Sequence, residues 1–497
     1  MAANFLFSAT QWMYIHSSPW DLSLALLALF VFRCINERLT NKGPMLWPVL
    51  GILPTLFLHI NDMYNFATRA LSEAGGTFYH KGMWLGGAYG IATADPSNIE
   101  FRDLLGDGIF NADDELWREQ RQTVKAEMHS SRFIEHSLQT MQDLVHQKLL
   151  KLTEKLVESG DSFDLQDVLL RFTFDNICTA AFGVNPGCLA LDFPDVPFAK
   201  AFEKATELTL FRFLIPPFIW KPMRFFGIGY EKALKEAVGI VHDFAEKTVN
   251  GRRDEISKHG RLCDQSDLLS RLIEMEYSGQ GKKVQFPDKY FRDLCVNFIL
   301  AGRDTTSVAL AWFFWLVHRN PEVENRILCE INDILSLRET QTKNGIIFTM
   351  EELNKMMYLQ AALSESLRLY PSVPNEVKEV VEDDVLPDGS IVKKGARDGF
   401  HMGENCLEFK PERWIRDGKF VSENQFKYAV FNAGPRLCLG KKFAYMQMKM
   451  VAASILLRYS VKVVEGHDAF PKMTTTLYMK NGLQVTLMPR LGKATAA

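Results

Sequence analysis

A cysteine, an arginine and two glycines stand close together in the segment FNAGPRLCLG, near the end of the chain. Cys438 precedes the amphipathic sequence LGKKFAYMQMKMVAASILLRY, so we expect it at the N-terminus of a helix. There the helix dipole and free N–H groups lower the pKa of a thiol and stabilise the thiolate. Gly434 and Gly440 let the backbone approach the sulfur closely. Arg436 could bind an anionic group beside the sulfur, and Phe431 could exclude water.

Cys438 has three candidate roles. A cysteine in an ordinary core would not need the neighbouring glycines. A nucleophilic cysteine needs a base, and no histidine lies nearby in the sequence. The sequence therefore favours a metal-bound thiolate. A single thiolate ligand with an aromatic wall and an arginine suits haem iron.

A long apolar segment, residues 290–319, is predicted to form a helix in the middle of the protein, because it is apolar on nearly all sides. Its AGRDTT stretch contains Gly302, Asp304, Thr305 and Thr306. A glycine inside a helix costs roughly 1 kcal/mol relative to alanine, and a buried aspartate is unfavourable without a partner. A threonine hydroxyl can bond back to the carbonyl four residues earlier and loosen the helix. These features indicate a groove with a proton route. The alternative is a packed helix in which the aspartate meets an arginine.

Two further pairs share a helix face. Glu365 and Arg368 stand at i and i+3 in an apolar helical sequence, which makes a buried ion pair plausible, with Arg413 of KPERW as a further partner. Trp117 and Arg121 stand at i and i+4. An indole N–H and a guanidinium that point the same way suit a carboxylate-bearing ligand. The alternative is an ordinary amphipathic pair.

The N-terminus has a different composition. Residues 22–32, LSLALLALFVF, are apolar except for Ser23 and are followed by Arg33, Arg38 and Lys42. The run is shorter than the roughly 20 residues of a full span, but positive charge behind it would keep the remainder cytosolic. We expect a membrane anchor; the alternative is a buried N-terminal helix. The next stretch, GPMLWPVLG, contains two prolines and two glycines and predicts a stiff, non-helical strap.

Composition excludes some classes of protein. The chain of 497 residues has a net charge of −3, and no basic patch carries interleaved aromatic residues, so we expect no nucleic-acid partner. The eight cysteines are scattered without a CxxC pair, which indicates a reducing compartment.

The predicted fold class is mainly α with a small β component. We expect residues 1–42 to form the membrane anchor and linker, and residues 43–497 to form the catalytic domain. Besides the central segment, helical periodicity is clear at 136–158 and 233–258. Strand-like pieces lie at 377–382, 384–395 and 483–489.

Taken together, these motifs resemble those of the cytochromes P-450. The family signature FxxGxRxCxG is met by Phe431, Gly434, Arg436, Cys438 and Gly440. The WxxxR pair, the AGxDTT helix, the ExxR pair and the PERW stretch occur in the family's order, from the proline strap to the C-terminus. The stretches AGRDTT, LRLYPSVP and FNAGPRLCLGKKFAYMQMK are most similar to plant fatty-acid ω-hydroxylases of the 86 group, B type. Those enzymes act on long and very-long acyl chains in cutin and suberin biosynthesis.

The resemblance implies a cytochrome P-450 fold with haem b between the long central helix and the cysteine loop. Cys438 would be the axial thiolate, which favours O–O cleavage. Trp117, Arg121 and Arg436 would hold the haem propionates, and Phe431 would wall the site.

On the other side of the haem, Gly302 would make room for O2, and Asp304 and Thr305 would deliver protons to it. Other residues match family positions near this distal pocket: Phe298, Ala301, Val373 and Pro374.

The implied partners are NADPH-cytochrome P-450 reductase, O2, membrane lipid and a long-chain fatty acid. The implied location is the endoplasmic reticulum membrane, with a single N-terminal anchor and a cytosolic catalytic domain. Lys441 and Lys442 could meet an acidic reductase, although a solvated helix face is the simpler account of two lysines.

Two stretches are shorter than the resemblance implies. Glu100 runs directly into Phe101, where the family has a helix and a loop that roof the distal pocket. Residues 395–409, GARDGFHMGENCLEF, are also short and lead directly to Pro411. Two hypotheses therefore stand: a membrane-anchored monooxygenase of acyl chains, or a non-catalytic or unstable variant that lacks part of its substrate pocket.

Overall fold

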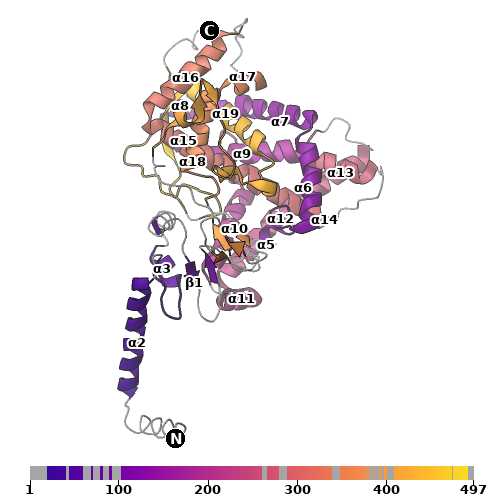
Figure 1. The fold of residues 1–497 in the computed structure, drawn as a ribbon. Helices are drawn as coiled ribbons and strands as arrows, with labels where there is room; N and C mark the ends of the chain where they lie inside the picture. Colours follow the sequence, from indigo (N-terminus) through magenta and orange to yellow (C-terminus); the bar gives the residue numbers. More distant parts are fainter. Residues whose placement is uncertain are drawn as a thin grey trace, which may run out of the picture. The chain divides into compact units, whose positions relative to one another are not determined.

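The chain forms two compact units in the computed structural model: Met1–Ser97 with Val377–His401, and Asn98–Glu376 with Met402–Ala497 (Figure 1). The residues that the structure describes are 19–40, 44–59, 66, 69–70, 79–81, 89–91, 102–215, 217–259, 266–278, 288–338, 347–374, 377–379, 384–385, 391–392, 397–399, 408–472 and 474–490. The junction of Glu100 with Phe101 and most of the 395–409 stretch lie outside them.

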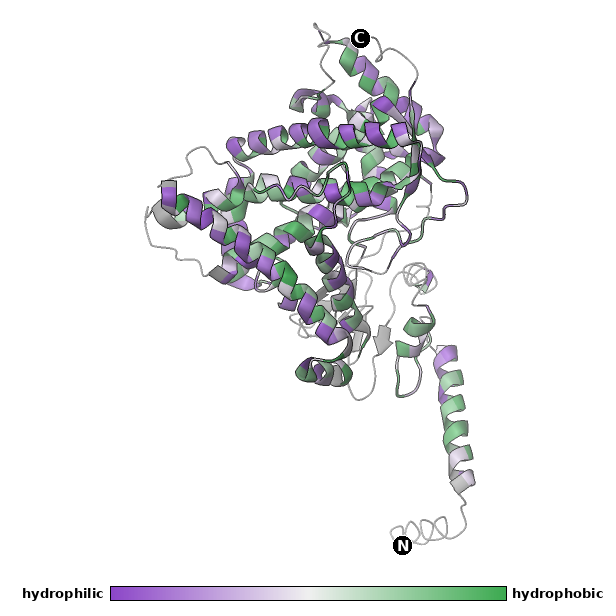
Figure 2. Ribbon diagram, turned by 180° about the vertical axis from the view of Figure 1, so that it is seen from behind, coloured by the Kyte–Doolittle hydropathy of each residue, from purple (hydrophilic) through white to green (hydrophobic). Residues whose placement is uncertain are grey.

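The first unit begins with helix α2, Pro19–Thr40, which contains the apolar run of the sequence. Figure 2 shows its middle part as predominantly hydrophobic. The side chains of Leu24, Leu29 and Phe32 are exposed. Among the described residues, no helix combines the length and apolar character needed to span a bilayer.

The predicted strap is non-helical where the structure describes it. Trp47 and Gly51 pair their backbones in both directions, at 2.7 and 2.8 Å. The Trp47 indole donates to Thr55 Oγ1 at 3.0 Å, and that hydroxyl donates to the Met45 carbonyl at 2.8 Å. These bonds fix the strap against the short helix α3, Leu53–Leu58.

Short antiparallel strand pairs complete the first unit. Two of the predicted strand-like pieces are confirmed here, because β4 lies in the first and β5 and β6 form a hairpin across the second. The pairs are β1 (Tyr79–Lys81) with β2 (Tyr89–Ile91), β4 (Val377–Glu379) with β7 (Arg397–Gly399), and β5 (Asp384–Val385) with β6 (Ile391–Val392).

The second unit is built around the predicted central helix. It runs as α14 (Asp288–Ile299), a π-helical turn η2 (Leu300–Asp304) and α15 (Thr305–Arg319). Most side chains of α15 are buried, which confirms its place in the core. Helix α9, Leu165–Phe182, packs along η2 and α15.

Other helices cover this centre and show hydrophobic and hydrophilic residues alternating along their length (Figure 2). They are α5 (Arg102–Leu105), α6 (Asp114–Met128), α7 (Ser131–Leu144), η1 (Val145–Leu149), α8 (Leu150–Ser159), α10 (Pro197–Leu214), α11 (Pro217–Phe226), α12 (Gly229–His259), α13 (Leu268–Ser278), α16 (Pro321–Ser336), α17 (Met350–Lys355), α18 (Met357–Leu369) and α19 (Lys441–Arg458). The periodicity at 136–158 and 233–258 is confirmed by α7 to α8 and by α12.

A three-stranded sheet lies beside these helices. It has the order β10 (Tyr459–Val463), β11 (Gln484–Pro489) and β3 (Phe163–Asp164), all antiparallel. The predicted strand at 483–489 is β11, whereas the sequence analysis did not predict β10. A small hairpin, β8 (Ile415–Arg416) with β9 (Lys419–Phe420), follows the 3-10 helix η3 (Pro411–Trp414). The fold class is therefore mainly α with few short strands, as predicted.

The predicted ExxR pair is buried and has the predicted third partner. Glu365 on α18 is fully buried and accepts two hydrogen bonds from Arg368, both at 2.9 Å. The Arg413 Nε lies 3.3 Å from Glu365 Oε1. The Lys410 amide and the Trp414 indole also donate to this carboxylate, at 3.0 and 2.9 Å. This one carboxylate ties α18 to η3, just before the segment that carries the thiol.

We expect Glu365→Gln to lower the free energy of unfolding by about 3–5 kcal/mol, because it leaves two guanidinium groups without their buried counter-charge. Urea denaturation followed by circular dichroism measures this. The matched control is Glu412→Gln on η3, since Glu412 is exposed where it pairs with Arg326 and should change stability by less than about 1 kcal/mol. Equal, small effects of both substitutions would contradict the structural role of Glu365.

Candidate active site

Cys438 lies at the start of α19, as predicted. Gly440 is the residue before the helix, and the amides of Gly440 and Lys441 donate to the sulfur. The Cys438 amide donates to the Phe431 carbonyl at 2.8 Å, which closes the loop on itself. Gly434 has a φ of +63°, a backbone conformation that favours glycine at this tight turn.

The charge state of the thiol depends on opposed effects. Burial raises the pKa of Cys438 above its usual value, while the amide of Gly440 and the cations Arg121 and Lys441 lower it. The helix start therefore acts in the predicted direction, but burial outweighs it. Part of the cysteine surface remains accessible even though protein atoms surround the side chain. The sulfur thus has an open side that a ligand can approach.

Trp117, Arg121 and Arg436 come together beside the thiol. The Arg436 guanidinium lies 4.3 Å from the centroid of the Trp117 ring, and that of Arg121 lies 5.5 Å from it. Arg121 also donates to the Leu437 carbonyl at 2.6 Å, next to the cysteine. Arg436 donates to the Asp113 carboxylate at 2.6 Å.

Positive charge is only partly compensated in the arginine cluster of Trp117, Arg121 and Arg436. Burial lowers the pKa of Arg121, and the positive charge of Arg436 lowers it further, while the charge of Cys438 raises it. Asp113 compensates one of the two guanidinium groups. A carboxylate placed between them would form charge-assisted hydrogen bonds and relieve their repulsion. The cluster therefore fits the propionate side of a haem.

Phe431 lies beside residues of α19, and its predicted role in excluding water from the thiol stays a prediction. Its ring lies 5.3 Å from the ring of Tyr445, and the Lys441 ammonium lies 5.5 Å from it. Leu439 and Phe443 pack against the apolar core that contains Phe298 of the central helix, and Leu300 packs against the same core. The thiol loop and the central helix thus share one packed core.

The central helix is distorted at the AGRDTT stretch. Leu300–Asp304 forms a π-helical turn, a rare feature that often occurs at functional sites. Thr305 Oγ1 donates to the Ala301 carbonyl at 2.5 Å, and Ser372 Oγ donates to the Thr305 carbonyl at 2.7 Å. Ala301 is exposed and Thr305 is partly exposed, so these two residues form an accessible face of the helix. The predicted loosening of this helix is confirmed.

Gly302 faces another helix closely. A Cβ atom on Gly302 would lie 2.6 Å from Ile177 of α9. The missing side chain therefore lets α9 and the central helix approach each other. Its predicted role in making room for O2 stays a prediction.

Asp304 points away from the accessible face and is fully buried. Its Oδ1 accepts a hydrogen bond from Arg303 at 2.6 Å, so the alternative raised for the sequence, a packed aspartate with an arginine partner, is observed. Arg303 also donates to the Tyr478 hydroxyl at 3.3 Å. Burial raises the pKa of Asp304, against the lowering effects of Arg303 and the Tyr478 hydroxyl. Among the residues that the structure describes, none forms a hydrogen bond to Asp304 Oδ2.

The remaining distal residues occupy different environments. Phe298 is buried, whereas Val373 is exposed and Pro374 is partly exposed. The structure therefore leaves Val373 accessible at the segment that follows α18.

The sequence analysis missed several residues of this region. Tyr478 is separated from Asp304 by more than 150 positions, and no local pattern connects them. The sequence analysis also missed Asp293 and Asn297, whose side chains bind the backbone of residues 105–110. The glycines of GDG in that segment were the available signal, because a glycine indicates close approach of the backbone.

A mainly helical protein with one accessible thiol at a helix start, two guanidinium groups beside it and a π-distorted central helix has the features of a haem-thiolate protein. Comparison with known proteins agrees. The cytochrome P450 family description matches residues 92–487, and the chain belongs to the cytochrome P450 family. Members of this family are monooxygenases that bind haem through a cysteine thiolate and use O2 and a redox partner.

Several relatives cover most of the chain. Cytochrome P450 86B1 of Arabidopsis thaliana is 48% identical over 94% of this chain and 89% of its own length. Alkane hydroxylase MAH1 of the same plant is 35% identical over 94% of this chain and 97% of its own. The crystal structure of the cytochrome P450DA haem domain superposes with a TM-score of 0.71 at 19% identity, covering 90% of this chain and 98% of that one, which supports the fold.

We expect Tyr478→Phe to destabilise the protein more at pH 8 than at pH 5. The hydroxyl of Tyr478 lowers the pKa of Asp304, so its loss raises that pKa further. A carboxyl group with a raised pKa in the folded state binds protons there, and its contribution to stability is lost as pH rises through that pKa. Removal of the hydroxyl therefore lowers the free energy of unfolding further at high pH. The expected size is about 1–3 kcal/mol for a buried hydrogen bond.

Urea denaturation at both pH values measures the difference from the unsubstituted chain. The control is Tyr370→Phe. The Tyr370 ring stacks on the Trp312 ring with their centroids 3.9 Å apart, away from the hydrogen bonds of Arg303 and Asp304. A Tyr478→Phe effect that is independent of pH would contradict the coupling to Asp304.

Proposed function

We propose that the chain hydroxylates the terminal (ω) carbon of long or very-long-chain fatty acids, as in cutin and suberin lipid metabolism. The observation that carries the proposal is the thiol of Cys438, held with one open side between the arginine cluster and the core of the central helix. The substrate class follows the resemblance to the 86 group and the identity of 48% with cytochrome P450 86B1. The relative named alkane hydroxylase supports an unactivated hydrocarbon chain as the target.

In the proposed site, Cys438 binds the haem iron through its thiolate, and Arg121 and Arg436 bind the propionates. Bound haem supplies the chemistry: with O2, two electrons from NADPH through a reductase and two protons, one oxygen atom enters the C–H bond and the other leaves as water. The amides of Gly440 and Lys441 hold the negative charge on sulfur.

The distal residues handle protons and exclude water. Thr305 Oγ1 lies on the accessible face and can accept or pass a proton there. Burial raises the pKa of the Asp304 carboxyl group and Arg303 opposes this, so Asp304 would exchange a proton within the buried network. Phe431 and the apolar residues around it keep the thiol side dry.

Terminal hydroxylation requires positioning, since C–H bonds inside an alkyl chain are weaker than those of the end methyl group. Holding reactants in one geometry supplies much of an enzyme's rate enhancement. An apolar channel that presents only the end of the chain to the Ala301 and Thr305 face would meet this need.

The short stretches favour a second candidate function. If the roof of the distal pocket is absent at Glu100–Phe101, the chain binds haem but hydroxylates poorly, because water enters and the acyl chain is not aligned. This is the non-catalytic or unstable variant of the same enzyme.

To separate these candidates, the chain is expressed as it stands and with both stretches restored from cytochrome P450 86B1, each with a reductase, NADPH and a long-chain fatty acid. We expect at least about tenfold more ω-hydroxy acid from the restored chain, because small errors of position reduce catalysis strongly. Equal haem content and product in both forms would refute the interpretation of the short stretches.

The same assay tests whether Cys438 binds the haem iron. Cys438→Ser in the restored chain should abolish product and the ferrous–CO band typical of thiolate ligation. A thiolate-type band that survives this substitution would show that another residue binds the iron.

We also propose that residues 1–42 anchor the protein to the endoplasmic reticulum membrane and that residues 43–497 form the cytosolic catalytic part. The apolar side chains of α2 are exposed, and Arg33 and Arg38 lie in its second half. Cations at that end of the helix favour a cytosolic position for the rest of the chain.

We expect deletion of residues 1–42 to move the chain from carbonate-washed membranes to the soluble fraction without loss of haem. The haem spectrum of the soluble fraction controls for folding. A truncated chain that still sediments with membranes would mean that another surface binds lipid.

A further inference from the structure

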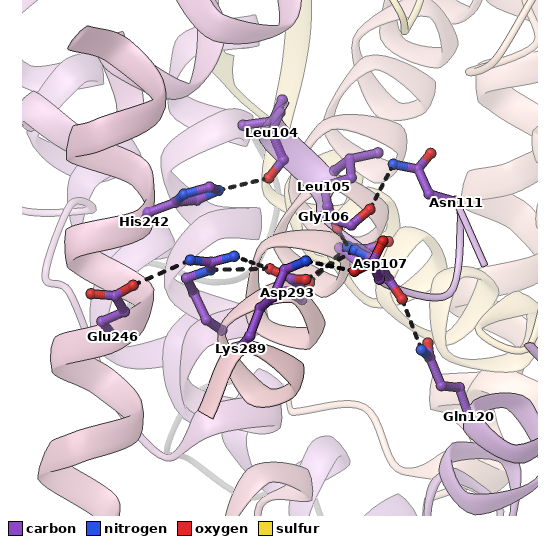
Figure 3. Close-up of polar contacts among 12 residues, drawn as sticks. Leu104, Leu105, Gly106, Asp107, Asn111, Gln120, His242, Glu246, Lys289 and Asp293 are labelled. Atoms are coloured by element: carbon purple, nitrogen blue, oxygen red, sulfur yellow. Dashed lines mark hydrogen bonds and ion pairs between the residues drawn. The ribbon is translucent and has the colours of Figure 1, made fainter. Parts of the chain in front are cut away.

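The backbone between α5 and α6 is fastened by buried polar side chains of α14. Asn297 Nδ2 donates to the Leu105 carbonyl at 2.8 Å, and its Oδ1 accepts from the Phe110 amide at 3.2 Å. Asp293 Oδ2 accepts from the Asp107 amide at 2.9 Å. Figure 3 shows Asp293 directed toward the backbone at Gly106 and Asp107. We call residues 104–113 the tethered segment.

Two glycines allow this close approach. Gly106 has a φ of +58°, and a Cβ atom on it would lie 2.0 Å from Asp293 Oδ2. A Cβ atom on Gly108 would lie 2.1 Å from Asn297 Nδ2. The two polar side chains therefore occupy the space that side chains of the segment would otherwise fill.

Other helices add bonds to the same backbone (Figure 3). His242 of α12 contacts the Leu104 carbonyl through Nε2 at 3.0 Å, and Gln120 of α6 donates to the Asp107 carbonyl at 2.8 Å. Asn297 is fully buried and Asp293 nearly so. Buried groups of this kind are costly to leave unpaired, so the position of the segment is well determined.

The far end of the tethered segment belongs to the arginine cluster. Arg436 donates to the Ala112 carbonyl at 3.0 Å and to the Asp113 carboxylate at 2.6 Å. At the near end, Asn297 holds the Leu105 carbonyl to α14, shortly before the π-helical turn of the central helix. The segment thus joins the central helix to a residue beside the thiol.

We propose that Asn297 is a positioning residue: by fastening the tethered segment to the central helix it sets where Arg436 stands beside Cys438. Asn297 acts through Leu105, Phe110 and the chain that leads to Ala112, without touching the ligand of Arg436. This inference rests on the proposed function in one respect, because the ligand of Arg436 is taken to be the haem propionate.

The test is amide hydrogen exchange of the full haem-loaded chain, read by peptide. Asn297→Ala should speed exchange about tenfold or more in residues 105–113, because a lost buried hydrogen bond makes local opening easier. Faster exchange should extend to residues 434–437, which contain Arg436, while residues 445–456 of α19 stay unchanged. Haem transfer to excess apomyoglobin should become several-fold faster, with the thiolate-type ferrous–CO band kept in the haem that remains.

Two further variants keep the test independent of one substitution. Gly108→Ala pushes the segment away from Asn297 while leaving Asn297 intact, so it should give the same pattern. The matched control is Asn320→Ala: Asn320 Nδ2 donates to the carbonyl four residues earlier at 2.7 Å, as Asn297 does, but at the other end of the central helix. Asn320→Ala should leave exchange in 105–113 and haem transfer unchanged.

Unchanged exchange in residues 105–113 of both Asn297→Ala and Gly108→Ala would overturn the tether. Faster exchange there, without a change in residues 434–437 or in haem transfer, would overturn the link to Arg436. If the unsubstituted chain takes up no haem, the proposed function fails. Hydrogen exchange in residues 105–113 and 434–437 still decides whether Asn297 positions Arg436.

Discussion

In the proposed site, the thiol of Cys438 must be surrounded by protein atoms and still carry the negative charge needed to bind iron. Burial and charge oppose each other, because a buried anion loses its water. Burial does raise the pKa of Cys438, and two amides with Arg121 and Lys441 act against it. These groups are effective only at short range. The loop and the start of α19 must therefore be held firmly, and much of the second unit serves that requirement. Lys449, for example, anchors α19 by donating to the Leu353 carbonyl at 2.7 Å.

The central helix meets a second constraint, since it must be packed and yet present an irregular, accessible stretch. The π-helical turn at Leu300–Asp304 gives up regular hydrogen bonding, and polar side chains compensate. Thr173 of α9 and Ser307 both donate to the Arg303 carbonyl at 2.8 Å. Ser372 does the same for the Thr305 carbonyl. The irregular turn is therefore supported by its neighbours and is a defined feature of the fold.

Buried ion pairs constrain the geometry of the interior. Arg303 with Asp304, Glu365 with Arg368, and Arg212 with Glu231 all lie in the interior. Such pairs add little net stability, because removing two charges from water is costly. Their value lies in geometry, since a charge buried without its partner would be strongly unfavourable. Arg212 with Glu231 therefore favours one arrangement of α10 and α12, while the other two pairs join residues of a single helical stretch.

The sequence by itself determined the parts whose physics is local. It predicted Cys438 at a helix start, the apolar central helix with its distortion, and the buried Glu365 with Arg368, because period and neighbouring residues govern these features. It also placed Trp117 and Arg121 on one helix face. Only the tertiary structure brought Arg436 onto the Trp117 ring, since more than 300 positions separate them.

The same reason explains the other differences. The sequence could indicate that Asp304 needs a partner, but not that Tyr478 would join Arg303 beside it, or that Asn297 would hold the backbone of Leu105 and Phe110. The net pKa of Cys438 also depended on burial, which local pattern does not report. Contacts between distant segments and the loss of water around a group are set by the packing of the whole unit, and they exist only once the chain has folded.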